Sequence, residues 1–475
     1  MVGIKSISVH IPFLMLPREL ISKAWGSRSI GGQKSMANYD EDSITMAVEA
    51  ASGCLNSQDR QEMDSIFFCS TTSPYKEKQS SAIIATATDL KRDILTCDFA
   101  NSIRAGGLGL RLAIDSVKSG SAKNVMVVAS DCRIGYPQSE DEQLFGDGAA
   151  AVVVGEKDPI AIFEYCSSLT NEITDVWRTD KDQFVRSWEN RWVLTYGYTK
   201  TMSEMISRTM EETNLKPDSF SKVILYAADP RTHRSLAQSL GFDVKEQLQD
   251  PLISSIGNAG AASILLMLAA TLEGSKPGDR ILIGGYGDGA DAFVLKVTDR
   301  IEEFKHKIGL GAKLGNRKAI MSYEKYLAFR NILETVPEAP FSIDSAATVL
   351  WRDRSWVLGL HGSRCKECGL VSFPVQRVCF GCQSKDNFEE VRLSDKEGKV
   401  FTFSLDYLAG TPDSPVVQTV LESSEGSARI YCMMTDVDPK EVKVDMEVKM
   451  TFRRIREARG FYNYFWKCRP LRGGF

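Results

Sequence analysis

The chain has 475 residues, 43% of them hydrophobic, so it is too long for one ordinary core and has enough apolar side chains to build two or three domains. The chain contains 58 Lys and Arg residues and 62 Asp and Glu residues. This balance excludes a global positive field that would attract nucleic acid or an anionic membrane. Because the sequence shows no apolar run of roughly 18 to 20 residues and opens on a strand-like segment rather than a signal peptide, we expect a cytoplasmic protein.

Short β-branched runs alternate with longer helical stretches from residue 1 to about residue 297, which is typical of layered α/β folds. The predicted strands lie at residues 65–69, 124–129, 149–154, 222–226, 280–283 and 292–297. The predicted helices between them include residues 43–55, 106–119, 200–213 and 259–272.

The segment at 300–332 is charged and helical in pattern, and the run Thr-Val-Pro-Glu-Ala-Pro at 335–340 then breaks the helix. Beyond it, several short β-rich segments predict a small all-β barrel. These segments are 399–405, 416–421, 428–433 and 448–452. The predicted divisions of the chain are therefore a large domain, a linker, a cysteine-rich module and a barrel domain, at 1–332, 333–348, 349–390 and 391–475.

Four of the eleven cysteines form two CxxC pairs, Cys365 with Cys368 and Cys379 with Cys382, with ten residues between the pairs. Each pair places two thiolates on one tight turn, and tetrahedral zinc takes four. Two redox pairs are the alternative, but a dithiol motif does not explain the duplication. We therefore expect a closed, structural zinc ribbon. The remaining cysteines stand alone and are expected to be small buried hydrophobic side chains: Cys54, Cys69, Cys97, Cys132, Cys166, Cys432 and Cys468.

Glycine-rich segments punctuate the first 300 residues in a fixed order: STTSPY at 70–75, DFANSIRAG at 98–106, FGDGAAA at 145–151, GNAGAAS at 257–263 and GGYGDGADAF at 284–293. In order and spacing they resemble the thiolase superfamily, and more narrowly the archaeal-type HMG-CoA synthases and their ketoacyl-ACP synthase III relatives. The likeness continues through 175–178 and 323–330 and so covers nearly all of residues 1–332. It implies a layered α/β thiolase fold with two βαβ-type halves. The glycines fit neither a P-loop nor a dinucleotide-binding fingerprint.

Residues 336–475 are similar to the zinc-ribbon and OB-fold proteins that accompany thiolases and HMG-CoA synthases as a separate subunit. The run WRDRSW at 351–356, before the cysteines, and the run GKVFTF at 398–403, after them, carry this likeness. An OB-fold can instead bind single-stranded nucleic acid through aromatic side chains in a basic groove. The acidic balance of this chain argues against that use.

In the family that the large domain resembles, a cysteine at the start of a buried helix takes the acyl group and is activated by a histidine and by the helix N-terminus. The motif at 98–106 sets the register, and the cysteine position holds Ile103. The histidine position holds Tyr226, and the position of the synthases' glutamate holds Thr71. Asn258 keeps the family's asparagine. The resemblance therefore implies a condensing-enzyme fold that has lost its thiol, its imidazole and its acid.

Cys132, at the end of a predicted strand, and His233 form the nearest replacement pair. The chain has four histidines, and an imidazole base in the large domain is expected to be His233. A histidine in a polar run such as Pro-Arg-Thr-His-Arg, at 230–234, is however more often a solvated surface residue. Its neighbours Arg231 and Arg234 are better candidates as contacts for the phosphates of coenzyme A, with Asn258 completing the expected CoA-binding residues. A solvated loop explains the two arginines equally well.

Three functions follow from these observations. The one we favour is a non-nucleophilic subunit that binds or channels acyl-CoA for a catalytic thiolase, as a thiolase-fold dimer or in a hetero-oligomer with that thiolase. The first alternative is an active acyltransferase of the HMG-CoA synthase or thiolase type with a displaced nucleophile such as Cys132. The second is a scaffold or nucleic-acid binder acting through the OB-fold. The expected ligands are structural zinc and a CoA thioester, with no nucleic acid and no membrane as partners.

Overall fold

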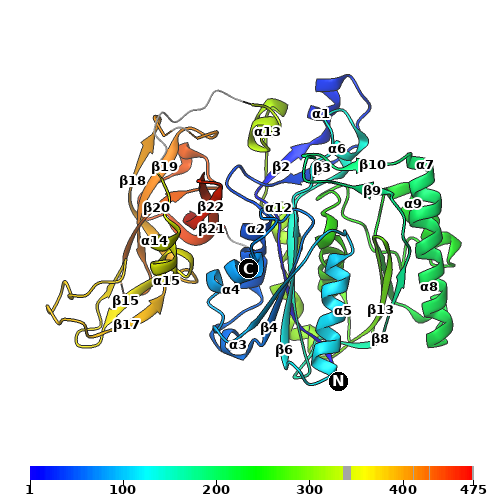
Figure 1. Ribbon diagram of the computed structural model, residues 1–475, viewed down its shortest axis with the longest axis horizontal. Coiled ribbons are helices and arrows are strands. Elements are labelled where there is room, and N and C mark those ends of the chain that lie inside the picture. The colour runs from blue at the N-terminus through cyan, green and yellow to red at the C-terminus, as the bar shows by residue number, and fades with distance from the viewer. Residues whose placement is uncertain (335–343, 410, 427, 473–475) are drawn as a thin grey trace.

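The structure is a computed structural model, and it describes residues 1–334, 344–409, 411–426 and 428–472. Most of the predicted linker at 333–348 therefore lies outside the described residues. Figure 1 shows two bodies side by side, a large α/β domain and a smaller β-rich part. The boundaries given above for the four segments stay predictions.

A nine-stranded mixed sheet forms the centre of the large domain (Figure 1). Buried, β-branched runs such as GAAAVVVG at 148–155 have no polar side, which is expected of strands covered on both faces. In spatial order the strands are β11 Lys222–Leu225, β12 Arg280–Tyr286, β13 Gly289–Val297, β8 Ala161–Thr170, β1 Gly3–His10, β7 Gly148–Gly155, β6 Asn124–Asp131, β4 Ser65–Cys69 and β5 Leu95–Phe99. The three strands β5, β4 and β6 run parallel, as do β11 and β12.

Helices cover both faces of this sheet. Helix α2 begins with a capping box, in which Asp42 accepts from the backbone of Thr45 and Thr45 accepts from the backbone of Asp42. The longer helices are α1 Arg18–Trp25, α2 Ser43–Gly53, α4 Ser80–Ala87, α5 Ala105–Lys118, α8 Lys200–Thr213, α9 Pro230–Ser239 and α10 Ser263–Gly274. Helices α5 and α10 lie in one apolar cluster with β1, β6 and β12. Figure 1 places α2 and α4 at one side of the domain and α8 and α9 at the opposite side.

Shorter elements complete the large domain. They are β2 Leu14–Pro17, β3 Gln33–Met36, α3 Ser57–Glu62, α6 Glu140–Leu144, β9 Val176–Trp177, β10 Arg186–Ser187, α7 Asn190–Trp192, a π-helix Val193–Thr199, 3-10 turns at Pro217–Ser219, Gly260–Ala262 and Lys305–Lys307, α11 Ile301–Phe304, α12 Leu310–Gly315, β14 Lys318–Ala319 and α13 Tyr323–Phe329. The segment predicted to be helical at 300–332 is thus three short helices interrupted by β14, which pairs with β2.

The smaller part contains a three-stranded sheet and a closed barrel. Helices α14 Ala347–Arg352 and α15 Arg354–Leu358 precede the sheet of β15 His361–Cys365, β16 Val371–Ser372 and β17 Phe388–Arg392. The barrel closes in the order β18 Glu397–Asp406, β19 Val416–Ser423, β20 Arg429–Met434, β22 Phe461–Pro470 and β21 Glu447–Ala458, with a 3-10 turn at Pro439–Glu441. Three of these strands contain the segments predicted from the sequence, β20 begins one residue after the start of its predicted segment, and β22 was missed.

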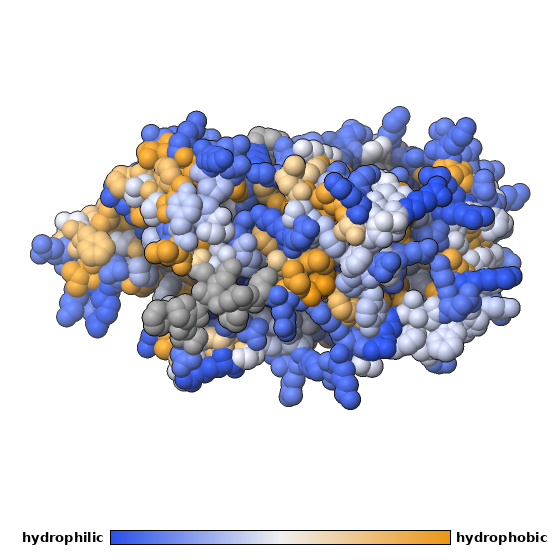
Figure 2. Space-filling view, turned by 90° about the horizontal axis from the view of Figure 1, so that it is seen from above, coloured by the Kyte–Doolittle hydropathy of each residue, from blue (hydrophilic) through white to orange (hydrophobic). Residues whose placement is uncertain are grey.

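The barrel packs against the side of the large domain formed by α2 and α4. One apolar cluster contains Ile44 of α2, Ile84 of α4 and Val400, Phe452 and Trp466 of the barrel. The two bodies therefore share a core rather than a loose contact. None of the described helices combines the length and the hydrophobicity of a membrane-spanning segment. Hydrophilic residues are spread over the whole face shown in Figure 2, and the hydrophobic ones form small separate groups.

Candidate functional site

Ile103 lies two residues before α5, at the entrance of the helix where the resemblance places a nucleophile. Its half-buried side chain packs against the main apolar cluster. Gly287, with a φ of 145°, comes so close that a Cβ there would lie 2.8 Å from Ile103 Cγ1. The helix entrance is thus covered by hydrocarbon and by the backbone of the 284–293 segment, with no thiol.

Arg104 follows this isoleucine and is the N-cap residue of α5. A cation at a helix N-terminus is unfavourable, because the helix dipole is positive there. The fully buried carboxylate of Asp291 compensates at 3.6 Å from Arg104 Nε, and Arg104 Nη1 also donates to the carbonyl of Leu169 at 2.7 Å. Burial raises the pKa of Asp291, while Arg104 lowers it. This ion pair fixes the helix entrance against β13.

Tyr226 and Asn258 form the centre of the candidate site. Asn258 Nδ2 donates to Tyr226 Oη at 2.7 Å and to the carbonyl of Ala227 at 3.2 Å, and Asn258 Oδ1 accepts from the backbone of Gly260 at 2.9 Å. Both side chains are about 5% exposed. The tyrosine hydroxyl therefore lies beside Asn258, just after the end of β11. The assignment of Tyr226 to the position of the family's histidine stays a prediction.

Two further tyrosines and an aspartate surround Tyr226. Tyr198 donates to the carbonyl of Tyr226 at 2.5 Å, and the Tyr286 hydroxyl donates to Asp175. The rings of Tyr226 and Tyr286 lie 6.1 Å apart between centroids. Burial raises the pKa of Tyr226 and of Tyr286. The phenols are therefore protonated at neutral pH and are not bases: Tyr286 donates to Asp175, and Tyr226 accepts from Asn258.

Thr71, which the resemblance assigns to the position of the family's acid, is bound to a carboxylate. Its hydroxyl donates to Asp131 Oδ2 at 3.0 Å and its backbone N–H to Asp131 Oδ1 at 2.7 Å. Asp131 is completely buried and also accepts from Ser70 and from the backbone of Ala261. Sequence reasoning missed Asp131 and named its neighbour Cys132. The available signal was a carboxylate directly after a buried strand.

Arg133 is a second residue that sequence reasoning missed. Its guanidinium stacks 4.2 Å from the centroid of Phe145, and its side chain is only 6% exposed. A Cβ on Gly260, whose backbone donates to Asn258, would lie 2.8 Å from Arg133 Cδ, so Arg133 lines the same site. Its positive charge lowers the pKa of Tyr226 against the effect of burial. Among the described residues, Nη1 of this buried guanidinium has no hydrogen-bond partner. An unpartnered buried donor beside Tyr226 is suited to a carbonyl or carboxylate oxygen of a ligand.

The structure does not bring Cys132 and His233 together as a catalytic pair. Cys132 contacts Thr72, with Sγ 3.7 Å from the hydroxyl, and burial raises the pKa of its thiol to about 11. His233 is 1% exposed, so the expectation of a solvated histidine is wrong: helix α9 turns it inward. Burial lowers its pKa to about 4, and it hydrogen-bonds to the backbone of Leu225. A protonated thiol and a sequestered imidazole are poor nucleophile and base.

Arg231 and Arg234 are exposed near the N-terminus of α9, in the segment that follows Tyr226. Asp229 caps this helix by accepting from the backbone of Arg231 at 2.8 Å. Helix α9, which carries both arginines, lies at the side of the large domain away from the barrel (Figure 1). Their assignment to coenzyme A stays a prediction.

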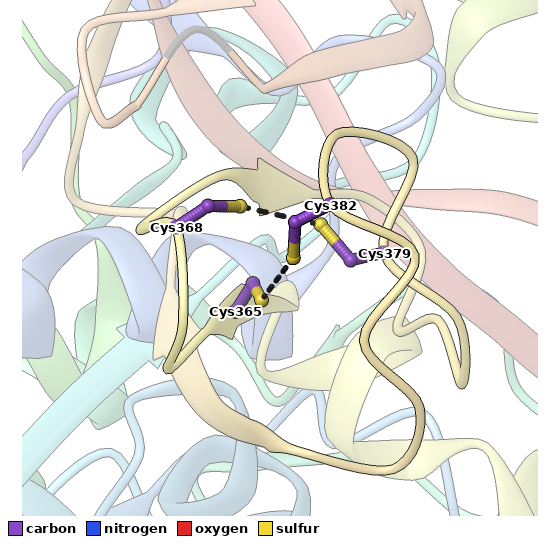
Figure 3. A group of neighbouring side chains, drawn as sticks. All are labelled: Cys365, Cys368, Cys379 and Cys382. Atoms are coloured by element: carbon purple, nitrogen blue, oxygen red, sulfur yellow. Dashed lines mark hydrogen bonds between the residues drawn. The ribbon is translucent and has the colours of Figure 1, made fainter.

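The four predicted metal ligands converge in the smaller part (Figure 3). Their sulfur atoms all lie within 4.8 Å of one another, with Cys365 Sγ 3.6 Å from Cys382 Sγ and Cys368 Sγ 3.4 Å from Cys379 Sγ. A tetrahedral zinc with Zn–S bonds of about 2.3 Å places its sulfurs roughly 3.8 Å apart. The four cysteines, all of them free of disulfides, therefore fit a four-coordinate metal.

Comparison with known proteins agrees with this architecture. The family model for 3-oxoacyl-[acyl-carrier-protein] synthase III matches residues 97–168, and the model for the C-terminal part of that enzyme matches residues 210–297. Among solved structures, an HMG-CoA synthase complexed with CoA is similar at a TM-score of 0.66 and 18% identity, over 73% of this chain and 94% of that one. The 3-oxoacyl-[acyl-carrier-protein] synthase III of Aquifex aeolicus is similar at a TM-score of 0.57 and 23% identity, over 62% of this chain and all of that one.

Curated relatives are more similar in sequence. The hydroxymethylglutaryl-CoA synthase of Thermococcus sibiricus is 32% identical over 336 residues, which are 69% of this chain and 96% of the relative. That of Methanosphaera stadtmanae is 31% identical over 341 residues, 70% of this chain and 98% of the relative. The relatives are matched almost from end to end, and the additional length here accommodates the cysteine cluster and the barrel. The chain belongs to the hydroxymethylglutaryl-CoA synthase family of the thiolase superfamily.

Proposed function

We propose that this protein is a non-nucleophilic member of its family, which binds or channels acyl-CoA for a catalytic thiolase instead of forming an acyl-enzyme. The observation that carries the proposal is the side-chain content of the site. Ile103 stands at the entrance of α5, and the hydroxyl of Tyr226 is held 2.7 Å from Asn258 Nδ2. Isoleucine offers no lone pair, so an acyl group has nothing to transfer to at this position.

The remaining groups support binding without covalent chemistry. Tyr226 accepts a hydrogen bond from Asn258 through its oxygen, which leaves its own proton for a thioester carbonyl. Arg133 supplies a second, charged donor beside it. We propose that the exposed Arg231 and Arg234 of α9 contact the CoA phosphates. One end of the ligand would thus meet neutral and cationic donors, and the other end two exposed cations.

The alternative of an active acyltransferase requires a displaced nucleophile. Cys132 is the candidate, and it is disfavoured because its raised pKa, about 11, leaves little thiolate at neutral pH. The thiol also faces Thr72 rather than the α5 entrance. We therefore keep the first proposal.

The cysteine cluster is proposed to hold structural zinc. Four thiolates leave no open position for a substrate, so the ion would tie the segment before β16 to the segment before β17 and take no part in chemistry. Since the bodies share a core, the metal would also support the surface that the barrel presents to the large domain. We propose that the large domain pairs as a thiolase-fold dimer and that the intact module docks a catalytic thiolase.

Mass spectrometry after incubation with acetyl-CoA tests the absence of covalent transfer. The wild-type chain is expected to stay unmodified while binding CoA measurably in a calorimeter. The double substitution Ile103→Cys with Tyr226→His restores the family's thiol and imidazole, and we expect it to gain one acetyl group. In that step the thiolate introduced in place of Ile103 would attack the thioester carbonyl and CoA would leave as its thiol.

The matched control is Cys132→Ser in the wild-type background. If the wild type carries an acetyl group that Cys132→Ser abolishes, the non-nucleophilic proposal fails and the displaced-nucleophile enzyme replaces it. Isolation of the chain as a homo-oligomer with full condensing activity would overturn the proposal equally.

The zinc proposal has its own test in metal content and hydrogen exchange. The purified chain is expected to contain one zinc per chain, and Cys379→Ser to lose it, with fast amide exchange in β15–β17 and unchanged exchange in the large domain. Structural zinc contributes on the order of 10 kcal/mol to small modules, so the change should be complete rather than graded. Cys97→Ser, at a half-buried cysteine outside the cluster, is the control and should retain the metal. Zinc retained by Cys379→Ser would contradict the assignment.

A further inference from the structure

A cavity of about 440 Å³ lies between the large domain and the barrel. Its wall is formed by the end of β1, by α2 and α12 on one side and by β21 and β22 on the other. Ligand sites commonly have volumes of about 300–1,000 Å³ and commonly lie at domain interfaces. The cavity is therefore large enough for a nucleotide-sized molecule.

The charge of this cavity is strongly one-sided. Seven arginine and lysine side chains line it, against two carboxylates among the described residues, Glu49 and Asp395. The chain as a whole is acidic, with a formal net charge of -4, so the excess of cations is local. Cavities of one sign with low-dielectric walls concentrate ligands of the opposite sign.

The two carboxylates do not neutralise the cations around them. Glu49 accepts from Arg469 at 2.7 Å, and Asp395 lies 3.3 Å from Arg60. Arg317 donates instead to backbone carbonyls, with Nη1 2.7 Å from the oxygen of Ser255. Arg472 likewise donates to a backbone carbonyl, and no described carboxylate lies within salt-bridge distance of either arginine.

The protonation behaviour of the lysines agrees with an excess of positive charge. Burial and the neighbouring Arg469 lower the pKa of both Lys313 and Lys449 to about 8, against the opposing effect of Glu49. Lys313 Nζ donates to the carbonyl of Val9 at 2.7 Å, which keeps it at the cavity wall. A bound anion would offset this repulsion, whereas water can do so only in part.

This site is separate from the candidate acyl-CoA site. Arg231 and Arg234 lie on α9, which Figure 1 shows at the side of the large domain opposite the barrel. The cavity is instead lined by residues of β21 and β22 of the barrel and of the part of the large domain that faces them. None of the residues proposed to meet the thioester, Tyr226, Asn258 and Arg133, lines the cavity. The inference that follows is therefore independent of the proposed function.

We propose that the cavity binds a small molecule carrying two or more phosphate groups, which bridges the large domain and the barrel. Lys313 and Arg317 contribute from the large domain, and Lys449, Arg469 and Arg472 contribute from the barrel and the segment after it. Because the cations belong to two bodies, a bound anion also stabilises the association of the large domain with the barrel. Free polyphosphate and nucleotides offer the same chemistry to these side chains.

Isothermal titration of the full-length protein with inorganic pyrophosphate tests the site. We expect saturable binding with a dissociation constant in the micromolar range, and at least a tenfold loss of affinity in the double variant Lys313→Gln with Lys449→Gln. Lys440→Gln, at an exposed barrel lysine outside the cavity, is the matched control and should bind as the wild type does. Melting curves of all variants establish that each is folded.

Two further arms identify the site and the source of the phosphates. The variant Arg231→Glu with Arg234→Glu should bind pyrophosphate normally, which separates this cavity from the acyl-CoA site. Titration with ADP that is at least tenfold tighter than with pyrophosphate would identify a nucleotide, and equal affinity would identify an inorganic polyphosphate. Absence of pyrophosphate binding below millimolar concentration, or loss of binding in the Arg231 and Arg234 variant but not in the lysine variant, would overturn the proposal.

Discussion

Two neighbouring regions of the interface between the large domain and the barrel use the same residue types in opposite ways. In the first, which we call the ion cluster, Arg453 of β21 binds Glu41 and Asp436 at 2.6 Å each, and Lys467 binds Asp40 at 2.7 Å. In the second, the cavity, seven cations meet two described carboxylates.

The difference lies in charge balance and exposure. The members of the ion cluster have side chains at most 4% exposed, and each cation there has a carboxylate partner. The charged side chains around the cavity are for the most part half-buried and can be reached by solvent. Paired, sealed charges fix how two bodies dock, while an excess of reachable cations leaves a place for an anionic ligand.

The largest effect is expected from breaking the ion cluster with Arg453→Met. The substitution leaves Glu41 and Asp436 buried without their cation, and such a loss costs about 3–5 kcal/mol. Urea denaturation measures this loss of stability, and hydrogen exchange of the amides in β21 and β22 shows whether it is located at the interface. Arg429→Met, at an exposed arginine of the barrel whose pair with Glu422 is 3.4 Å, is the control and should cost less than about 1 kcal/mol. Equal losses for both variants would show that the cluster does not hold the interface.

The next effect concerns acid. Burial alone would raise the pKa of Glu49, but Arg469, with His10 and Arg453, lowers it to about 2. A depressed carboxyl pKa contributes stability that is present above the unfolded value of about 4.5 and is lost as pH falls from there toward 2. We expect the free energy of unfolding to fall on the order of 3 kcal/mol through this one group.

Glu49→Gln provides the comparison for that measurement. The variant should be less stable than the wild type at pH 7, and the difference between the two should shrink as pH approaches 2. Glu447→Gln, at an exposed glutamate of β21, should keep the full acid dependence of the wild type. If Glu49→Gln unfolds along the wild-type pH profile, the Glu49 carboxylate does not contribute the expected acid dependence.

The sequence predicted the fold far better than these two regions. The motifs of the large domain, read with the 3.6-residue and two-residue periodicities, placed β4 and α8 at their observed bounds, and the cysteine spacing predicted a cluster whose sulfurs converge. Such signals are local, because a glycine turn or a CxxC knuckle is specified within a few residues. Strand β22 was missed, since its run FYNYFWKCRP mixes aromatic and charged residues without regular alternation.

The candidate site was predictable where it follows a motif and not where it depends on packing. The register of two sequence segments singled out Tyr226 and Asn258. In the structure, Asn258 Nδ2 lies 2.7 Å from the Tyr226 hydroxyl. Asp131 and Arg133 escaped because their roles arise from burial and from partners far away in the sequence, such as Thr71 and Ala261. His233 was assigned to the surface from its polar neighbours, but the turn of α9 decides its environment. The cavity combines residues from both ends of the chain, which no local pattern reveals.

The smallest expected effect, and the one that best separates the two regions, comes from Lys449→Gln. Burial, Arg469 and Lys313 lower the pKa of Lys449 to about 8, while Glu49 and Glu397 oppose them. Since the unfolded lysine titrates near 10.5, the unfolded chain holds more protons between about pH 8 and 10.5, and stability should rise with pH in that window. At pH 7 the substitution removes a repelled charge, so without ligand we expect the variant to be as stable as the wild type or slightly more stable, by less than about 1 kcal/mol. Its stability should also rise less than that of the wild type from pH 8 to 10.

Urea titrations of both proteins from pH 7 to 10, without phosphate in the buffer, measure the difference in stability. A clear loss of stability of Lys449→Gln at pH 7 would place Lys449 with the ion cluster instead of the cavity.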